Sequence, residues 1–273
     1  MISRALFRAE RLLQEGASAG HILGLDTGTS IASLALVSNG RIVQTINRTA
    51  PSHGAAIPGM VDEIVSGAGL SIRDLNAIAV GIGPGSFTGL RIGISYAKGL
   101  AMATECSMVG VPSFDAIALA GLDASDARPG RLICVIFDAR KGEVYAALYR
   151  VVADGLEKLS EELVVALEHL ASRITEEALF VGDSRAKDAA ALVGARGLWV
   201  AVLETGTLNL RGACVAAIGG ARLSRGEPER SESIEPLYVR TPDATFKRSE
   251  SDPAKISTEV LWSSERKSSF GSI

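Results

Sequence analysis

Short apolar runs bounded by turn residues open the chain and predict a strand followed by a hairpin. Residues 21–27 form one apolar run, and residues 31–38 and 41–48 carry apolar side chains on either side of Asn39-Gly40. Asn-Gly is a strong signal for a two-residue hairpin turn, because that turn requires positive φ at both central positions. We therefore expect three antiparallel strands at the start of the fold.

Helix and strand patterns then alternate, and a second hairpin begins the second half of the chain. Residues 51–66 carry apolar side chains at helical intervals, and residues 131–138 and 143–152 repeat the hairpin pattern. Further elements are expected over residues 77–82, 108–111, 113–122, 178–182, 212–223 and 236–240. The predicted divisions are an N-terminal extension, two α/β subdomains and a disordered tail, over residues 1–20, 21–122, 123–240 and 241–273.

A glycine-rich loop and the helix that follows it, residues 81–105, form the segment around which the chain is organised. Small residues recur at every fourth position of this helix, namely Gly89, Gly93, Ala97 and Ala101. That spacing places all four on one helical face, and a glycine within a helix costs roughly 1 kcal/mol relative to alanine. The compensating gain is a close helix contact, which lies either within the same domain or with a partner chain.

Composition and charge narrow the range of functions. The 273 residues include 28 Lys+Arg and 31 Asp+Glu, which gives a net charge of −3. This charge argues against a chain that binds nucleic acid on its own. The three cysteines form no paired motif and the three histidines have no metal-ligand spacing. We therefore expect no metal site and a reducing, cytoplasmic setting. No apolar run is long enough to span a membrane.

The turn Asp26-Thr27-Gly28-Thr29 at the end of the first strand allows three interpretations. An aspartic protease would need a second Asp-Thr-Gly or a homodimer of an all-β chain, whereas this chain has one Asp-Thr-Gly and an α/β pattern. An actin-like ATPase would use Gly28 and Thr29 as phosphate donors, with Asp26 orienting a metal-bound water. The structural alternative is a tight turn closed by an Asx-type hydrogen bond. In the ATPase interpretation residues 138–140 form a second phosphate turn, but Arg140 stands where a glycine is expected.

Two charged or titratable residues flank the predicted helices. His53 lies at the entrance of the helix over residues 51–66, where a capping or surface role is favoured over catalysis. Arg91 falls in the first turn of the central helix, where the helix dipole makes a cation unfavourable. We expect either an anionic neighbour or solvent to offset this charge.

Four segments, in this order along the chain, resemble one bacterial family. They read ILGLDTGTSIASLAL, AVGIGPGSFTGLRIGISYAKGLA, FDARKGEVYAALY and EPLYVR, and they lie between residues 22 and 240. The chain resembles the family of the tRNA threonylcarbamoyladenosine biosynthesis protein TsaB (YeaZ). The resemblance implies an actin/Hsp70-like (ASKHA) fold of two ribonuclease-H-like subdomains with mixed sheets, in a cytoplasmic protein.

The resemblance also implies partners. Members of this family pair with the TsaD paralogue, which carries the metal and transfers threonylcarbamoyl to the adenosine beside the anticodon of tRNA. The ATPase TsaE joins them, and TsaB proteins also form homodimers through the surface used for TsaD. The resemblance implies no catalytic residue, tightly bound cofactor or membrane association for this chain. The resemblance implies that partner subunits use ATP and metal, and that this chain contacts tRNA only through the complex.

In the light of this resemblance, the small-residue ridge is interpreted as a partner surface together with the helix after His53. The predicted interface residues are Ser86, Gly89, Arg91, Gly93, Ala97, Ala101 and His53. The turn Asp26-Thr27-Gly28-Thr29 becomes a possible vestigial phosphate turn. The alternative function is an ATP-dependent transferase or kinase of the same superfamily that acts alone, with Asp26 as its acidic group.

Overall fold

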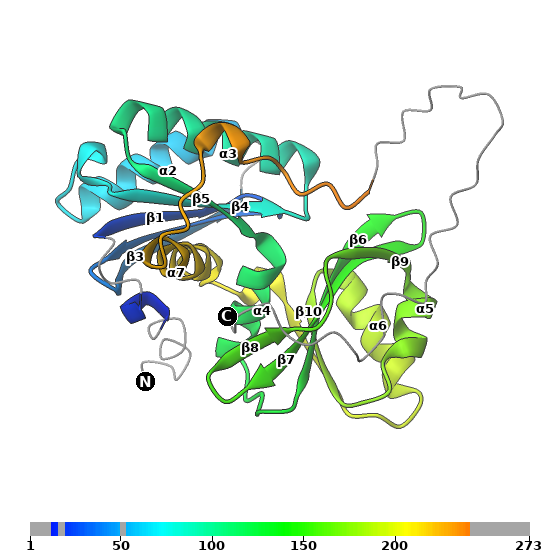
Figure 1. Ribbon diagram of the computed structural model, residues 1–273. Helices are drawn as coiled ribbons and strands as arrows, with labels where there is room; N and C mark the ends of the chain where they lie inside the picture. The colour runs from blue at the N-terminus through cyan, green and yellow to red at the C-terminus, as the bar shows by residue number, and fades with distance from the viewer. Residues whose placement is uncertain (1–11, 16–19, 50–52, 241–273) are drawn as a thin grey trace, which may run out of the picture.

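The computed structural model describes residues 12–15, 20–49 and 53–240, which form two lobes built on one sheet each (Figure 1). The first sheet has the strand order β3-β2-β1-β4-β5. Its strands are β1 (His21–Asp26), β2 (Ile31–Ser38), β3 (Arg41–Thr49), β4 (Ala77–Gly83) and β5 (Ser107–Pro112). The first three are antiparallel, as predicted, whereas β4 and β5 run parallel to β1. Asn39 and Gly40 have φ of 49° and 74°, as the hairpin prediction requires.

Alternate side chains of β1 contribute to two different cores. Leu23 and Leu25 pack with α2 (His53–Gly67) and α3 (Phe87–Thr104), whereas Ile22 packs in the core that includes α7 (Arg211–Ser224). α7 approaches the strand backbone closely, because a Cβ on Gly24 would overlap the carbonyl oxygen of Gly212. The first sheet is therefore covered by helices on both faces.

The second sheet repeats the arrangement of a hairpin followed by parallel strands. Its strand order is β11-β10-β6-β7-β8, with β9 also paired to β7. The strands are β6 (Leu132–Arg140), β7 (Glu143–Val152), β8 (Gly155–Lys158), β9 (Leu163–Ala166), β10 (Ala178–Gly182) and β11 (Val200–Glu204). Two helices of the second half of the chain are α5 (Leu167–Arg173) and α6 (Ser184–Gly194). The 3₁₀ turns of the described chain are η2 (Ile72–Asp74), η3 (Thr205–Thr207) and η4 (Ser231–Ser233). The hairpin β6–β7 was predicted, whereas β8, β9, β11, α5 and α6 were not.

The helix α4 (Ser113–Asp123) joins the two lobes, and all eleven of its residues are buried. Phe114 and Ile117 belong to the same core cluster as Val135 of β6 and Val181 of β10. α7 contributes Val215 and neighbouring residues to that cluster. One continuous core therefore runs from the first sheet through α4 and α7 into the second sheet.

After α7 the chain returns to the first lobe as a strap, residues 227–240, drawn at the orange end of the ribbon in Figure 1. Glu229 forms an isolated bridge with Met108 of β5, and the Leu237 amide donates a 2.7 Å hydrogen bond to the Ile82 carbonyl. The end of the strap thus closes on the first sheet, as predicted for residues 236–240.

The predicted division at residue 123 stays a prediction, but a cut there would separate α7 from the sheet on which it packs. Within the predicted N-terminal extension, residues 12–15 form a helical turn, and Leu13 is 2% exposed in the core. Residues 1–11 and 16–19 of that extension lie outside the described residues, as does the predicted tail over residues 241–273. Of the described helices, none combines the length and apolar character needed to cross a membrane.

Candidate functional site

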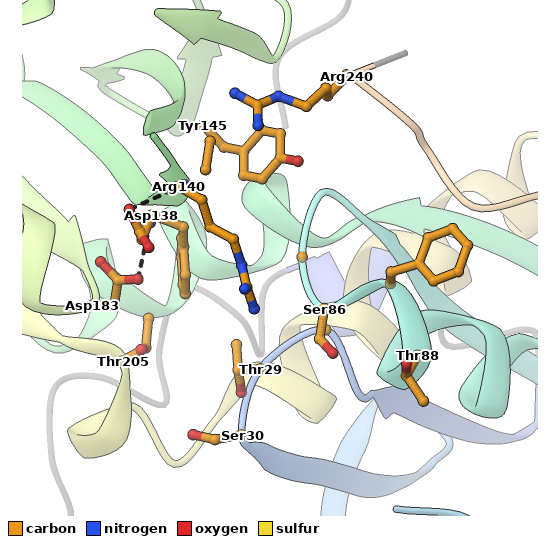
Figure 2. Close-up of a pocket in the computed structure, with 15 residues that line it drawn as sticks. Thr29, Ser30, Ser86, Thr88, Asp138, Arg140, Tyr145, Asp183, Thr205 and Arg240 are labelled. Atoms are coloured by element: carbon orange, nitrogen blue, oxygen red, sulfur yellow. Dashed lines mark hydrogen bonds between the residues drawn. The ribbon is translucent and has the colours of Figure 1, made fainter. Parts of the chain in front are cut away.

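A cavity of about 630 Å³ lies where the two lobes and the strap meet (Figure 2). Its first-lobe wall is the turn after β1 and the beginning of α3, and its second-lobe wall includes the end of β6 and the residue before α6. The labelled residues are Thr29, Ser30, Ser86, Thr88, Asp138, Arg140, Tyr145, Asp183, Thr205 and Arg240. Both lobes must keep their positions for this cavity to exist.

Gly28 and Thr29 of the turn after β1 line the cavity, whereas Asp26 does not. Asp26 Oδ1 accepts a 3.1 Å hydrogen bond from the Gly28 amide, so the Asx-type turn, one of the three interpretations of this segment, is present. Asp26 is 1% exposed, and a Cβ on Gly81 would overlap its Oδ2 atom. The carboxylate is therefore sealed beneath β4 and does not line the cavity.

A buried arginine lies near Asp26 and was not identified from the sequence. Arg211, the first residue of α7, is 1% exposed and donates hydrogen bonds to the carbonyls of Thr205 (3.1 Å) and Ile31 (2.6 Å). Burial lowers the pKa of Arg211, and the negative charge of Asp26 opposes that effect. The other carboxylate oxygen of Asp26, Oδ2, is buried without a hydrogen-bond partner in the described part of the chain.

The small-residue ridge of α3 faces its own sheet, which corrects the prediction that it contacts a partner chain. Gly89 and Gly93 are buried, and Ala97 and Ala101 are 1% and 5% exposed. A Cβ on Gly93 would overlap Thr27 Oγ1, and Thr27 Oγ1 donates a 2.8 Å hydrogen bond to the Gly89 carbonyl. The close contact inferred from the spacing exists, but it is made with the turn after β1.

The other predicted interface residues have different surroundings. Ser86 is exposed and caps α3, because its side-chain oxygen accepts a 3.2 Å hydrogen bond from the Gly89 amide. Arg91 is exposed, and His53 is the first residue of α2, with a side chain outside the described part of the structure. A partner contact of Ser86, Arg91 or His53 stays a prediction.

Arg91 is exposed to solvent, one of the two surroundings expected from the sequence, and it also has aromatic partners. Its Nε donates a 2.8 Å hydrogen bond to the Tyr238 hydroxyl, and its guanidinium carbon lies 3.8 Å from the centroid of the Phe87 ring. The rings of Phe87 and Tyr238 are 5.5 Å apart. The negative face of an aromatic ring attracts a cation, so this cluster offsets the charge and fastens the strap to α3. This cluster could not be predicted from local sequence patterns, because Tyr238 lies 147 positions from Arg91.

The second-lobe wall holds two carboxylates whose oxygens already accept hydrogen bonds. Asp183 caps α6 by accepting from the Arg185 amide at 2.9 Å, and its other oxygen accepts from the Asp138 amide at 2.9 Å. Asp138 Oδ1 accepts from the Arg140 amide at 3.1 Å. Arg140 has a φ of 65°, in the region that glycine adopts most readily. The sequence prediction that this position favours glycine thus agrees with the backbone conformation, although an arginine occupies it.

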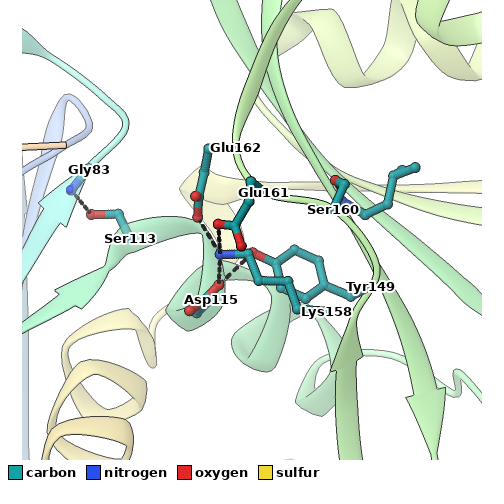
Figure 3. A network of polar contacts seen from close by, with 9 residues as sticks. Gly83, Ser113, Asp115, Tyr149, Lys158, Ser160, Glu161 and Glu162 are labelled. Atoms are coloured by element: carbon teal, nitrogen blue, oxygen red, sulfur yellow. Dashed lines mark hydrogen bonds and ion pairs between the residues drawn. The ribbon is translucent and has the colours of Figure 1, made fainter. Parts of the chain in front are cut away.

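A buried charged network lies between α4 and the second sheet (Figure 3). The Tyr149 hydroxyl donates a 2.7 Å hydrogen bond to Asp115 Oδ1, and Lys158 Nζ lies 3.1 Å from the same oxygen and 2.7 Å from Glu162 Oε1. Burial alone would lower the pKa of Lys158, but the two carboxylates raise it. Figure 3 also shows Ser113 of α4, whose Oγ accepts a 3.1 Å hydrogen bond from the Gly83 amide. The first turn of α4 is thereby bonded to both lobes.

Potential metal ligands are dispersed in the part of the chain that the structure describes. No group of three or more His, Cys, Asp and Glu side chains there is arranged to hold a metal ion. Cys106, Cys134 and Cys214 are all free thiols.

Comparison with known proteins gives consistent matches. The family model described as TsaD, tRNA N6-adenosine threonylcarbamoyltransferase, matches residues 45–201, more than half of the chain. The protein named tRNA threonylcarbamoyladenosine biosynthesis protein TsaB from Haemophilus influenzae is 28% identical over 83% of this chain and 96% of that protein. Its namesake from Bacillus subtilis is 30% identical over 59% of this chain and 70% of that protein. The namesake from Escherichia coli (strain K12) is 40% identical over 50% of this chain, and the match spans 57% of that protein.

A solved structure, YeaZ from Pseudomonas aeruginosa, has a TM-score of 0.66 and 26% identity over 80% of this chain and 99% of that chain. Two mixed sheets with covering helices and this likeness confirm the predicted actin/Hsp70-like (ASKHA) fold.

Proposed function

This chain belongs to the TsaB (YeaZ) family, and from that membership we propose that it is a partner-binding subunit in threonylcarbamoyladenosine formation on tRNA. In this proposal it binds and activates a TsaD paralogue, which carries out the transfer to the adenosine beside the anticodon. A TsaE ATPase joins the complex, and the partner subunits use the ATP and the metal. The tRNA binds to the assembled complex and not to this chain alone. The same surface forms a homodimer when the chain is alone, and the assembly works in the cytoplasm.

The observation that carries the proposal is the outward face of α2 and α3. Gly59 of α2 and Gly99 of α3 are exposed, and a Cβ on either would meet no atom within 4 Å. Each glycine costs its helix roughly 1 kcal/mol relative to alanine, and no packing contact among the described residues requires a glycine at either position. Met102 lies three residues after Gly99 and is 76% exposed. Bare backbone beside an exposed apolar side chain suits the close approach of a partner helix.

The experiment is size-exclusion chromatography with light scattering of this chain, alone and mixed with its TsaD paralogue. We expect a heterodimer that forms at the expense of a homodimer, and we expect Met102→Glu to weaken it by roughly thirtyfold or more, as for a central interface residue. The matched control is Leu192→Glu on α6, since Leu192 is 41% exposed and lies in the other lobe. Full association of a folded Met102→Glu variant would contradict the proposed surface.

The inter-lobe cavity favours a second candidate, an ATP-dependent transferase or kinase that acts alone. The cavity is large and is lined by both lobes, but Asp26, the acidic group of that interpretation, lies outside it. ATP turnover by the isolated chain that is lost in Asp26→Asn would favour this alternative. Turnover absent from the chain but present in the mixture with its paralogue would favour the subunit.

A further inference from the structure

The two helices that carry the proposed partner surface have opposite charges. α2 and α3 lie side by side on one face of the first sheet and pack into the same core (Figure 1). Apart from His53, the titratable side chains of α2 are the exposed Asp62 and Glu63. The charged residues of α3 are Arg91 and Lys98, and this helix contains no Asp or Glu. One helix is therefore acidic and its neighbour is basic.

The negative charge of α2 lies on its outward face. Asp62 follows the exposed Gly59 by three positions, so the two residues share a helical face. Asp62 has no ion-pair partner among the described residues, whereas Glu63 pairs with Arg48 of β3. Burial, and after it the charge of Asp62, raises the pKa of Tyr96, so Asp62 lies near the side of α3 that faces α2. The α2 side thus keeps one negative charge without a counter-ion.

The positive charges of α3 lie on the face that carries Met102. Arg91 and Met102 are eleven positions apart in the sequence, which is about three helical turns, so they share a face. Lys98 lies seven positions after Arg91 on the same face. Arg91, Lys98 and Glu235 of the strap line a cavity of about 310 Å³ between α3 and the strap. Two cations against one carboxylate leave this side with an excess of one positive charge.

The Arg91 side chain is held in place for a further contact. Its Nε donates to the Tyr238 hydroxyl, and the Phe87 ring lies against its guanidinium group. A guanidinium group has five N–H donors, and no hydrogen bond or ion pair uses its terminal nitrogens within the described chain. A side chain that is already ordered loses little entropy on binding, and arginine and tyrosine are enriched among the residues that dominate interface energies. Arg91 is therefore preorganised to donate to a carboxylate of a partner.

A surface with this division of charge is complementary to itself. When a second copy is rotated about a two-fold axis so that its acidic helix faces the basic helix of the first, the same favourable contact forms twice. Placing α2 opposite α2 would instead bring like charges together, which is unfavourable. The bare backbone at Gly59 and Gly99 permits the close approach. Both charges of the contact are present on this chain, so a second copy is the partner that its described residues specify.

We propose that two copies of this chain associate crosswise, with α2 of one protomer on α3 of the other, and that Asp62 opposite Arg91 and Lys98 selects this orientation. The inference rests on the proposed function, because it uses the partner surface assigned there. Apolar contacts around Met102 supply most of the affinity. The charges specify the orientation and exclude the arrangement of α2 on α2.

The test is reversal of charge on one helix at a time, measured by sedimentation and by light scattering at low ionic strength. The acidic-helix variant is Asp62→Lys, and the basic-helix variant combines Arg91→Glu with Lys98→Glu. We expect each variant alone to dimerise at least roughly tenfold more weakly than the wild type, because both of its contacts become repulsive. An equimolar mixture of the two variants should recover the association, because both contacts of the mixed dimer are again attractive. High salt should reduce these differences.

The matched controls reverse exposed charges on α5 in the second lobe. Glu168→Lys corresponds to the acidic-helix variant and Arg173→Glu to the basic-helix variant. Both should dimerise as the wild type does. Far-ultraviolet circular dichroism and thermal denaturation of every variant confirm that a loss of association occurs in a folded protein.

Three results would overturn the proposal. One is a wild-type chain that stays monomeric at high micromolar concentration. Another is a mixture of the two variants that fails to associate although both are folded. The third is a dimer that resists both reversals but is lost in Met102→Glu, which would retain the surface and exclude the crosswise orientation. Association with the TsaD paralogue is measured separately, so failure of the crosswise dimer is distinguishable from failure of the proposed function.

Discussion

The Tyr149 hydroxyl lies 2.7 Å from Asp115 Oδ1 and joins the middle of β7 to the first turn of α4. Tyr149 is fully buried, and burial together with the charge of Asp115 raises its pKa, so it remains a neutral donor. Lys158 completes the contact as the cation between Asp115 and Glu162. This network fixes α4 to the second lobe, while Ser113 fixes it to Gly83 at the end of β4.

Removing the cation of this network should destabilise the protein strongly. Lys158→Met would leave Asp115 and Glu162 without their counter-ion in a mostly buried site, and we expect a loss of roughly 3 kcal/mol in the free energy of unfolding. Tyr149→Phe leaves Asp115 short of one hydrogen bond and should cost roughly 1–2 kcal/mol. Urea denaturation measures both. The control is Arg48→Met, which breaks the exposed Arg48–Glu63 pair and should cost less than about 1 kcal/mol. Equal stability of Lys158→Met and Arg48→Met would show that the network is not structurally important.

The sequence predicts local features of this fold better than long-range ones. Asn39-Gly40 specifies its hairpin because the turn depends only on adjacent residues. The strands β8 and β9 have four residues each, too short to show a periodic pattern. The return of α7 to the first sheet depends on Gly24 and Gly212, which lie far apart in sequence, and neither carries a signal for the other.

The candidate site was predictable in part for the same reason. The turn at Asp26 and the unusual position of Arg140 could be found from adjacent residues. The spacing of Gly89 and Gly93 correctly indicated a close contact, but spacing cannot say which surface is on the other side. Lys158 and Asp115 lie 43 positions apart in the sequence and form their ion pair only in the folded chain.

Two glycines of α3 should respond in opposite ways to the same substitution. A Cβ on Gly93 would overlap Thr27 Oγ1, so Gly93→Ala should destabilise the monomer by roughly 1–3 kcal/mol through overpacking. A Cβ on Gly99 meets no atom within 4 Å, so Gly99→Ala should stabilise the helix by roughly 0.5–1 kcal/mol. Thermal and urea denaturation of the two variants provide the comparison. A Gly93→Ala protein as stable as Gly99→Ala would contradict the packing of α3 on the turn after β1.

The ion pair between Arg150 and Glu176 predicts a specific pH dependence. The Arg150 guanidinium donates hydrogen bonds of 2.7 and 2.8 Å to the two oxygens of Glu176, which lowers the pKa of Glu176 from its ordinary value of 4.5. The unfolded chain then binds the proton more readily than the folded chain. The stability contributed by ionised Glu176 is therefore fully present above pH 4.5 and is lost as the pH falls through the lowered pKa.

We expect Glu176→Gln to be less stable than the wild type at pH 7, with a difference that shrinks as the pH falls below 4.5. Denaturant titrations of both proteins over this range measure the difference. Glu235→Gln serves as the control, because Glu235 is exposed and has no ion pair within the described residues. A difference that stays constant down to acidic pH would exclude a lowered pKa of Glu176.

The three thiols should differ sharply in reactivity toward a disulfide reagent. Burial raises the pKa of Cys134 to about 12 and that of Cys214 well above its ordinary value, and both side chains are 0% exposed. Burial also raises the pKa of Cys106, but this thiol is only partly buried and its Sγ accepts a 3.2 Å hydrogen bond from the Thr104 hydroxyl. Because the thiolate is the reactive species, we expect the folded protein to show one accessible thiol, with slow kinetics that speed up as the pH rises. Cys106→Ser should abolish that phase, whereas Cys134→Ser should leave it unchanged. A rapid reaction of Cys134 in the folded protein would mean that the second lobe opens under native conditions, because its thiol lies in the core between β6 and its covering helices.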